Sequence, residues 1–512
     1  MGRWLSQIAS SLVGISMAIG TWHCAEAADE ASGPLLKAGF AERDITPELG
    51  MEAPGGYAKA RHAVFHDACK VRAAVFDDGR SRVALVGIDA LEIVRPMVAA
   101  ARKAIQARCG IPPHAVLIGA SHSHTSGPTC GVLPGQYDHA SPLVQSLAYE
   151  KTTCADPRYL KHVQQQIADA VCAANDCRAE SFCGAGSGIE DRATYNRRFR
   201  MKNGLCYTHP GQGNPDIVGP AGPIDPNVGV IGVWSREGRC TGCVVNFCCH
   251  GTTGPNGISA NWIYHMERTI RGAMGQDVVV VFLQGASGDV TQVDNLNPYV
   301  QPGQERWGEF VGGRVGAEAV KVLVSMPRGT LVPVNARTET LHIKRRIPRP
   351  ERVQKCLELV KQPEQKVGHT EWAFAKEIVL LDASLAKEKV KDVEVQAIQV
   401  GPVVLLANPA ECFCQTGLDM RARSPFPLTF IVELANDRLG YVPTEEAFGP
   451  HGGGYETRLT SCANLEPTAA RQIADACLRM AGQMTPGRLP KPPKAPPFGG
   501  AWTYGNVPPE LD

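Results

Sequence analysis

Short runs of β-branched and aliphatic residues recur along the chain, and most of them stop at a small group of polar residues. The runs lie at residues 82–89, 115–118, 243–249, 278–283, 403–406 and 428–433. Runs of this length bounded by turn residues are typical of strands, and their continuous apolar character indicates burial on both faces. This pattern restricts the fold strongly, because each such strand needs a covering layer on either side.

Helical periodicity fills several intervals between these runs. The predicted helices cover residues 96–108, 156–174, 305–326, 352–362 and 467–480. The alternation predicts an α/β or mixed α+β fold around a mixed β-sheet. Ligand sites in such sheets gather at the carboxyl ends of strands, which is where the polar groups of this sequence stand. Residues 187–229 are rich in Gly, Pro and Asn and are predicted to be a long loop, either disordered or functional.

The composition is that of a globular protein and argues against nucleic-acid binding. The 512 residues contain 52 Lys+Arg and 51 Asp+Glu, whereas a nucleic-acid binder usually carries a basic stripe. The 44% of hydrophobic residues are enough to build a core. The length allows about two to four domains. Residues 485–512 are rich in Pro and are predicted to form an extended tail.

The first residues have the pattern of a secretory signal peptide. Arg3 precedes an apolar stretch at residues 12–20, and a small-x-small cleavage site follows at Ala25 and Ala27. The apolar stretch is too short to span a membrane. We therefore predict a signal peptide at residues 1–27 and a secreted or periplasmic protein.

The cysteine content agrees with export. Eighteen cysteines are many for a cytosolic protein, and cleavage after residue 27 would remove Cys24 and leave an odd number. Cys240 and Cys243 form a CxxC pair upstream of His250. This pair together with the histidine has the spacing of half a structural zinc site. No second CxxC follows at a matching spacing, so disulfides or buried thiols are favoured for these cysteines.

Two histidines that stand two residues apart follow the run at 115–118. Residues i and i+2 of an extended chain face the same side, so His122 and His124 are expected to face one site. Either both imidazoles bind one metal ion, or one binds the metal and the other contacts a substrate. The alternative is a pair of hydrogen-bonded loop histidines, and the spacing alone does not separate these interpretations.

Other candidate residues stand after further strand-like runs. His250 ends one run, where a lone histidine is more often structural than a ligand. Glu411 lies in an apolar region, so its carboxylate needs a partner, either a metal ion or a helix N-terminus. Tyr441 and Tyr455 are loop aromatics, for which packing is the default role. Ser287 lies in a GASGD segment that lacks the last glycine of a nucleophile elbow and indicates a tight turn.

A series of short motifs in a fixed order gives the chain a resemblance to one enzyme family. The motifs lie at residues 38–47 (AGFAERDITP), 54–58 (PGGYA), 66–67 (HD), 73–76 (AAVF), 122–128 (HSHTSGP), 196–197 (NR), 246–250 (NFCCH), 288–290 (GDV), 409–411 (PAE) and 440–441 (GY). Together they resemble the N-terminal catalytic domain of the neutral/alkaline (non-lysosomal) ceramidases. The resemblance covers about residues 37–480, and we expect a single large ceramidase-like zinc hydrolase domain at residues 37–482.

The resemblance implies a zinc-dependent amidohydrolase that cleaves the N-acyl bond of ceramide to sphingosine and a fatty acid. It implies four ligands for one Zn²⁺ ion, which are His122, His250, Glu411 and Tyr441. It places three residues against the reacting amide, which are His124, Arg197 and Tyr455. In the implied mechanism a zinc-bound water attacks the amide carbonyl, Arg197 and a tyrosine stabilise the oxyanion, and His124 carries a proton to the leaving amine.

The sequence departs from the family pattern at three places, one of which is the unusual Cys248-Cys249 pair directly beside His250. Thr291 occupies the position of a serine that is proposed to be catalytic, and Gln292 and Val293 replace the usual Pro-Asn after it. The Pro-rich tail stands where the family has a C-terminal immunoglobulin-like domain. Two alternatives therefore stay open: a zinc hydrolase of the same fold that acts on another amide or ester, and a non-catalytic exported module held by disulfides.

The expected partner is a small lipid amide and not a nucleic acid. Ceramide is carried by lipid, so peripheral contact with a membrane stays open, although no amphipathic anchor helix stands out. The sequence defines neither the acyl-chain preference nor the oligomeric state.

Overall fold

In the computed structural model, which describes residues 36–502 and 504–512, six β-sheets organise the chain. The predicted signal peptide and Cys24 lie outside the described residues. The unit Pro34–Pro492 contains the helices and strands. The described residues from Pro493 onward belong to a second unit and contain no helix or strand.

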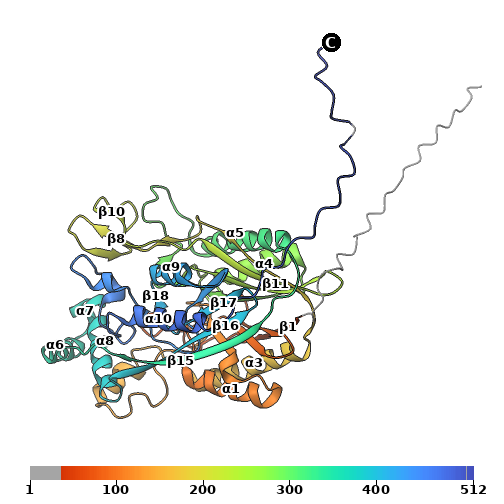
Figure 1. Ribbon diagram of the computed structural model, residues 1–512. Helices are drawn as coiled ribbons and strands as arrows, with labels where there is room; N and C mark the ends of the chain where they lie inside the picture. Colours follow the sequence, from red (N-terminus) through yellow and green to blue (C-terminus); the bar gives the residue numbers. More distant parts are fainter. Residues whose placement is uncertain (1–35, 503) are drawn as a thin grey trace, which may run out of the picture. The chain divides into compact units, whose positions relative to one another are not determined.

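The first large sheet has five strands. In spatial order they are β4 (Val116–Ala120), β3 (Arg82–Ile88), β2 (Lys70–Asp77), β1 (Lys37–Asp44) and β5 (Ala179–Glu180). Strands β3 and β4 are parallel, and the other neighbours are antiparallel. Helix α3 (Pro157–Asp176) packs on β1 and β2, and α1 (Arg95–Cys109) lies beside α3 (Figure 1).

The second large sheet lies on the other face of the first. Its spatial order is β13 (Val279–Gln284), β12 (Cys240–Phe247), β11 (Asn227–Trp234) and β6 (Phe182–Ile189), with β12 and β13 parallel. Helices α4 (Trp262–Met274) and α5 (Gln304–Ser325) pack against this second sheet (Figure 1). The two sheets approach closely at Gly87, where an added Cβ would lie 2.2 Å from the carbonyl oxygen of Phe282. Only glycine permits that approach. The two sheets therefore pack face to face, with α1 and α3 outside the first and α4 and α5 outside the second.

The third large sheet contacts both of the first two sheets. Its strands are β15 (Val334–Lys344), β16 (Val390–Val400), β17 (Val403–Ala407) and β19 (Leu428–Val432), with β17 and β19 parallel. The contacts run through β15 against β3 and through β19 against β12, β13 and β6. Helix α10 (Ala469–Gly482) packs on β16 and against α9 (Cys414–Arg423). A separate helical group contains α2 (Pro142–Tyr149), α6 (Pro350–Val360), α7 (Glu364–Val367) and α8 (His369–Leu385), and α8 contacts the other three.

Short elements connect these layers around the candidate site. The three small sheets are β10 (Ile217–Pro220), β8 (Arg198–Met201) and β9 (Cys206–Thr208); β14 (Val290–Thr291) and β7 (Tyr195–Asn196); and β18 (Glu411–Cys412) and β20 (Tyr441–Val442). The 3₁₀ turns are η1 (Pro113–Ala115), η2 (Glu445–Phe448) and η3 (Tyr455–Thr457). The prediction of one long loop over residues 187–229 is therefore wrong, because strands of two to four residues are too short to leave a periodic pattern.

The structure confirms the predicted mixed α/β fold. Each predicted helix and each predicted strand is present, with ends that differ by a few residues. The strands are divided among several sheets, whereas the sequence predicted one mixed sheet. An apolar run indicates that a strand is buried, but it carries no information about which strand pairs with it.

The cysteines of the described residues are free thiols, and most of them are buried. The predicted disulfides are therefore not found in that part of the chain. Cys248 lies two residues before His250, and its thiol donates to the carbonyl oxygen of Ala286 at 2.7 Å. Burial raises the pKa of this thiol well above its usual value, so it is a neutral packing group. Within the described ranges, every helix is too short or too polar to cross a bilayer.

A buried ion-pair group ties the first sheet to the helix layer behind the second. Arg72 on β2 donates to Asp89 at 2.8 Å and to Glu267 on α4. The side chains of Arg72 and Asp89 are each 2% exposed. Breaking a buried ion pair on one side leaves an uncompensated charge in the interior, which is strongly destabilising.

We expect Arg72→Met to lower the free energy of unfolding by about 3–5 kcal/mol, because the buried Asp89 loses its cation, whereas Glu267 keeps Lys70 and Arg271. Urea denaturation followed by circular dichroism measures this loss. Arg471→Met is the matched control, because the pair of Arg471 with Glu445 is solvent-exposed, and we expect no measurable change in the free energy of unfolding. A loss at Arg72 as small as that of the control would contradict the structural role given to this group.

Candidate metal and amide site

Three chain segments that follow strands of different sheets meet at one point. His122 follows β4 of the first sheet, and His250 follows β12 of the second. Glu411 begins β18, four residues after the end of β17 in the third sheet. Each of the three preceding strands has a parallel neighbour, so the site lies at strand carboxyl ends, as the sequence predicts.

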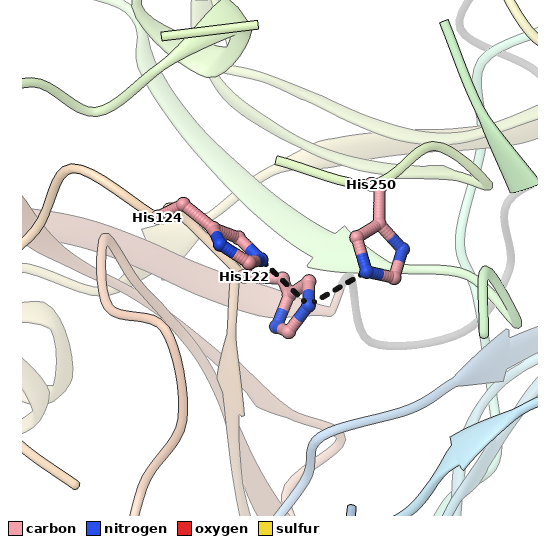
Figure 2. A group of neighbouring side chains, drawn as sticks. All are labelled: His122, His124 and His250. Atoms are coloured by element: carbon pink, nitrogen blue, oxygen red, sulfur yellow. Dashed lines mark hydrogen bonds between the residues drawn. The ribbon is translucent and has the colours of Figure 1, made fainter. Parts of the chain in front are cut away.

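The side chains converge closely. Nε2 of His122 lies 3.0 Å from Nε2 of His250 and 3.3 Å from Nε2 of His124 (Figure 2). The ligand nitrogens of the three histidines all lie within 4.8 Å of one another. Oε2 of Glu411 adds a carboxylate oxygen 3.2 Å from Nε2 of His122 and 3.5 Å from Nε2 of His250. The predicted grouping of these residues is therefore present.

The backbone determines which nitrogen of two of these rings carries a proton. Nδ1 of His122 lies 3.0 Å from the carbonyl oxygen of Leu91, and Nδ1 of His250 lies 2.9 Å from that of Ser287. A carbonyl oxygen only accepts, so each Nδ1 is the donor and each Nε2 of a neutral ring presents a lone pair. Two acceptors thus face each other without a proton. Oε2 of Glu411 is a third acceptor, which is buried and has no hydrogen-bond partner among the described residues.

Three converging acceptors fit a cation. A metal ion satisfies two imidazole nitrogens and a carboxylate oxygen at once, and the Nδ1–carbonyl bonds are the outer contacts that orient histidine ligands. The structure therefore supports a metal-binding group at His122, His250 and Glu411, with the imidazole of His124 directly beside it.

The charge state of His124 and His250 suits this role, whereas at His122 a metal ion has to replace a proton that Glu411 favours. Burial lowers the pKa of His250 well below its usual value, and the charge of Arg197 lowers it further. Burial, His122 and Arg197 do the same to the pKa of His124. For His122, burial lowers the pKa, but the nearby Glu411 carboxylate outweighs it and the pKa is raised. Neutral imidazole is the form that binds metal.

The backbone near the paired histidines differs from the predicted extended chain. His122 has a φ of 62°, in the left-handed region, so the prediction of an extended His-Ser-His segment is wrong. Ser123 holds the turn by donating its backbone N–H to Ala90 at 3.1 Å. Gly55 has a φ of 101°, and an added Cβ there would lie 2.4 Å from Nδ1 of His124. That position therefore requires glycine, which lets the backbone pass directly beside the His124 ring.

A second group of side chains lies next to the metal-binding group. Nη2 of Arg197 donates to the hydroxyl of Tyr455 at 3.1 Å and to the carbonyl oxygen of Gly288 at 2.8 Å. Its Nε donates to Glu456 at 2.9 Å. The Tyr455 hydroxyl is also hydrogen-bonded to that of Tyr441. Burial raises the pKa of Tyr455 to about 12, so the phenol keeps its proton.

The two remaining predicted residues are Tyr441, which contacts the metal-binding group, and Thr291, which is hydrogen-bonded elsewhere. Tyr441 on β20 pairs with Glu411 on β18, and its ring is parallel to that of His250 with centroids 6.5 Å apart. Thr291 instead donates its hydroxyl to Gln292 at 2.7 Å and lies 3.5 Å from the hydroxyl of Thr252. The catalytic role of Thr291 stays a prediction.

Sequence reasoning missed Glu456 and the two carbonyl groups that orient the histidines. Glu456 is fully buried and accepts from Arg197 and from Thr208. The only signal for Glu456 in the sequence is that it directly follows Tyr455. It belongs to no motif and to no periodic pattern. Ser287 lies in the predicted turn, and its hydroxyl donates to Glu433 at 2.5 Å while its carbonyl group holds His250.

A cavity of about 290 Å³ opens onto the site. The site residues on its wall are His122, His124, Glu411, Tyr441 and Tyr455. A volume of this order is at the lower end of the range for small-molecule sites. A small molecule in the cavity therefore reaches the converging acceptors and the tyrosine pair together.

Two solved structures have a similar fold. One is a ceramidase complexed with C2, with 18% sequence identity and a TM-score of 0.65, and the match covers 90% of this chain and 77% of that chain. The other is a neutral ceramidase from Pseudomonas aeruginosa, with 18% identity, a TM-score of 0.64 and the same coverage. No protein-family model and no curated protein matches the sequence. The chain therefore has the fold of the neutral ceramidases.

We expect the purified protein to bind one divalent transition-metal ion per chain, and His122→Ala to abolish the binding. Elemental analysis measures the bound metal. Added zinc should raise the melting temperature of the metal-stripped wild type but not of the variant, because a ligand that binds only the native state stabilises it. His342→Ala is the control, since that histidine is exposed and should not alter the metal content. Equal metal content in wild type and His122→Ala would refute the site.

Proposed function

We propose that this chain is a zinc-dependent amidohydrolase that cleaves the N-acyl bond of ceramide and releases sphingosine and a fatty acid. The observation that carries the proposal is the convergence of two imidazole Nε2 atoms and a carboxylate oxygen, on His122, His250 and Glu411, beside the Arg197–Tyr455 pair at a cavity. The fold supports the choice of substrate, since structures with a similar fold include a ceramidase complexed with C2 and a neutral ceramidase.

The proposed zinc ligands are His122, His250, Glu411 and Tyr441. Two nitrogens with oxygen ligands are a donor set that zinc accepts, and the buried, unpartnered Oε2 of Glu411 supports its place among them. When bound, zinc acts as a Lewis acid that would polarise the amide carbonyl and lower the pKa of water toward neutrality. Tyr441 is linked to the reacting side through its hydrogen bond to Tyr455.

Arg197 and Tyr455 are the proposed donors to the amide carbonyl oxygen. Negative charge develops on that oxygen during attack, and donors that are already fixed stabilise it without reorganisation. Arg197 is fixed by Glu456 and by the carbonyl oxygen of Gly288, and it is 4% exposed. Tyr455 lies on the cavity wall and keeps its proton.

His124 is the proposed proton carrier to the leaving amine. It lines the cavity, and its Nε2 lies 3.3 Å from Nε2 of His122. This position lets it contact the leaving nitrogen while His122 stays with the metal. We propose further that the protein acts outside the cytoplasm after removal of residues 1–27, on a lipid amide that a membrane can present.

A second candidate is a hydrolase of the same fold that acts on another amide or ester. The observation that favours it is the arrangement at Thr291, whose hydroxyl is engaged by Gln292 in this chain. Labelled ceramides, other N-acyl amides and esters, offered to the zinc-loaded protein, separate the two candidates. Fatty acid released from esters or other amides but not from ceramide would favour the second candidate.

We expect Arg197→Lys to lower kcat for a labelled short-chain ceramide by about 100-fold, with a smaller effect on KM, because one fixed donor to the developing oxyanion is lost. Steady-state kinetics at equal zinc content measures this. Arg200→Lys is the matched control, because Arg200 lies on β8 and forms an exposed ion pair with Glu446. If kcat stays within twofold of wild type in Arg197→Lys, the role of Arg197 is wrong.

A further inference from the structure

The turn between β13 and β14 contacts the His250 segment at three points. The backbone N–H of His250 donates to the carbonyl oxygen of Val290 at 3.1 Å, and its Nδ1 donates to that of Ser287 at 2.9 Å. Nε2 of Gln284 donates to the carbonyl oxygen of Cys249, the residue before His250, at 2.7 Å. The position of the His250 ring therefore depends on what holds this turn in place.

A buried carboxyl group that belongs to the third sheet holds the middle of the turn. Glu433 directly follows β19, and its Oε1 accepts from the Ser287 hydroxyl at 2.5 Å. The same hydroxyl accepts from Nε2 of Gln284 at 2.7 Å. The backbone N–H of Glu433 also donates to the carbonyl oxygen of Gln284 at 3.0 Å. A continuous path of hydrogen bonds thus runs from the third sheet through Ser287 to the ring of His250.

The side chains of this path lie too deep to contact a substrate. Gln284, Ser287 and Glu433 are all fully buried, and the described wall of the cavity does not include them. This placement excludes a nucleophilic role for Ser287, because a nucleophile must reach the substrate. The path can therefore act on the reacting centre only through His250.

The carboxyl group of Glu433 is costly to bury. Among the described residues it has no cation partner, and its Oε2 is buried without a hydrogen-bond partner. Burial raises the pKa of Glu433 well above its usual value, so the group keeps its proton and avoids an unpaired charge. An aliphatic side chain would still suit a purely structural core better, because an unpartnered polar atom in the interior is unfavourable. The carboxyl group is therefore better explained by the hydroxyl that it holds than by a contribution to stability.

We propose that Glu433 is a positioning residue, which orients the His250 ring toward the metal ion through the Ser287 hydroxyl. The inference rests on the proposed zinc site and adds to it a residue that contacts neither the ion nor the substrate. Loss of a contact that orients a metal-binding histidine costs about 10–100-fold in metal affinity. Glu433 acts one hydrogen bond further away than the Ser287 carbonyl group, so we expect the lower end of that range.

The test compares Glu433→Met, Glu433→Gln and Ser287→Ala by their zinc affinity, measured in competition with a chromophoric chelator. Glu433→Met and Ser287→Ala remove the same hydrogen bond, so each should weaken zinc binding by about 10-fold, and the double variant should lose no more than either alone. Glu433→Gln keeps an acceptor oxygen and should stay within about twofold of wild type. Ser287→Ala leaves the carboxyl group in place, so it carries the test if Glu433→Met fails to fold.

Glu377→Met is the matched control. Glu377 is also buried, at 2% exposed, and it also accepts from a serine hydroxyl, that of Ser461. It is not a proposed ligand, so its replacement should lower the melting temperature without changing the zinc affinity. The absorption spectrum of bound cobalt(II), which depends on the arrangement of the ligands, should change in Glu433→Met and not in Glu377→Met.

Three results would overturn the inference. If Glu433→Met and Ser287→Ala bind zinc as tightly as Glu377→Met, the inference fails and the proposed function stays intact. The same conclusion follows if Glu433→Gln loses as much affinity as Glu433→Met, because the acceptor oxygen would then not be the cause. If the wild type binds neither zinc nor cobalt(II), the proposed function fails and the inference fails with it.

Discussion

The His122 and His250 rings each donate their Nδ1 proton to a backbone carbonyl group, and the rest of the site depends on these two hydrogen bonds. With the proton fixed on Nδ1, both Nε2 atoms present lone pairs to the same small space, which the Glu411 carboxylate also enters. Three acceptors at such distances repel one another unless a cation lies among them. A metal ion among the three acceptors therefore accounts for the arrangement, whereas a hydrogen-bond network of acceptors alone would be unfavourable.

The layered sheets are what bring these acceptors together. In each large sheet, one strand that has a parallel neighbour ends at the site. The segment after that strand carries His122, His250 or Glu411. Close packing at Gly87 and the buried Arg72 group hold the first two sheets at a fixed separation. Because the ligands come from different sheets, their geometry depends on how the layers pack and not on any single segment.

The sequence was sufficient to predict the strands and the helices, and it named the three residues whose side chains converge, His122, His250 and Glu411. Apolar runs identify strands because burial on both faces leaves a continuous pattern, and the ordered motifs brought His122, His250 and Glu411 into one hypothesis. Sheet membership could not be predicted, because pairing depends on contacts between segments far apart in the chain. The short strands β7 and β8 on either side of Arg197 were missed, because two and four residues are too few to show a periodic pattern. Glu456 was missed because a single acidic residue carries no signal until its partner is known.

The 3₁₀ turn η3 places Tyr455 and Glu456 side by side, and both bind the same Arg197 guanidinium. The hydroxyl next to the reacting centre and the carboxylate that restrains the guanidinium therefore move as one rigid piece. The metal-binding histidines are attached to the sheets instead, and no residue of η3 orients them. In the proposed mechanism, the two histidine ligands thus follow strands of the large sheets, whereas Tyr455, which would contact the carbonyl oxygen, lies on η3. Under the proposed function, a change confined to η3 would therefore alter the contacts to the carbonyl oxygen while both histidine ligands keep their positions.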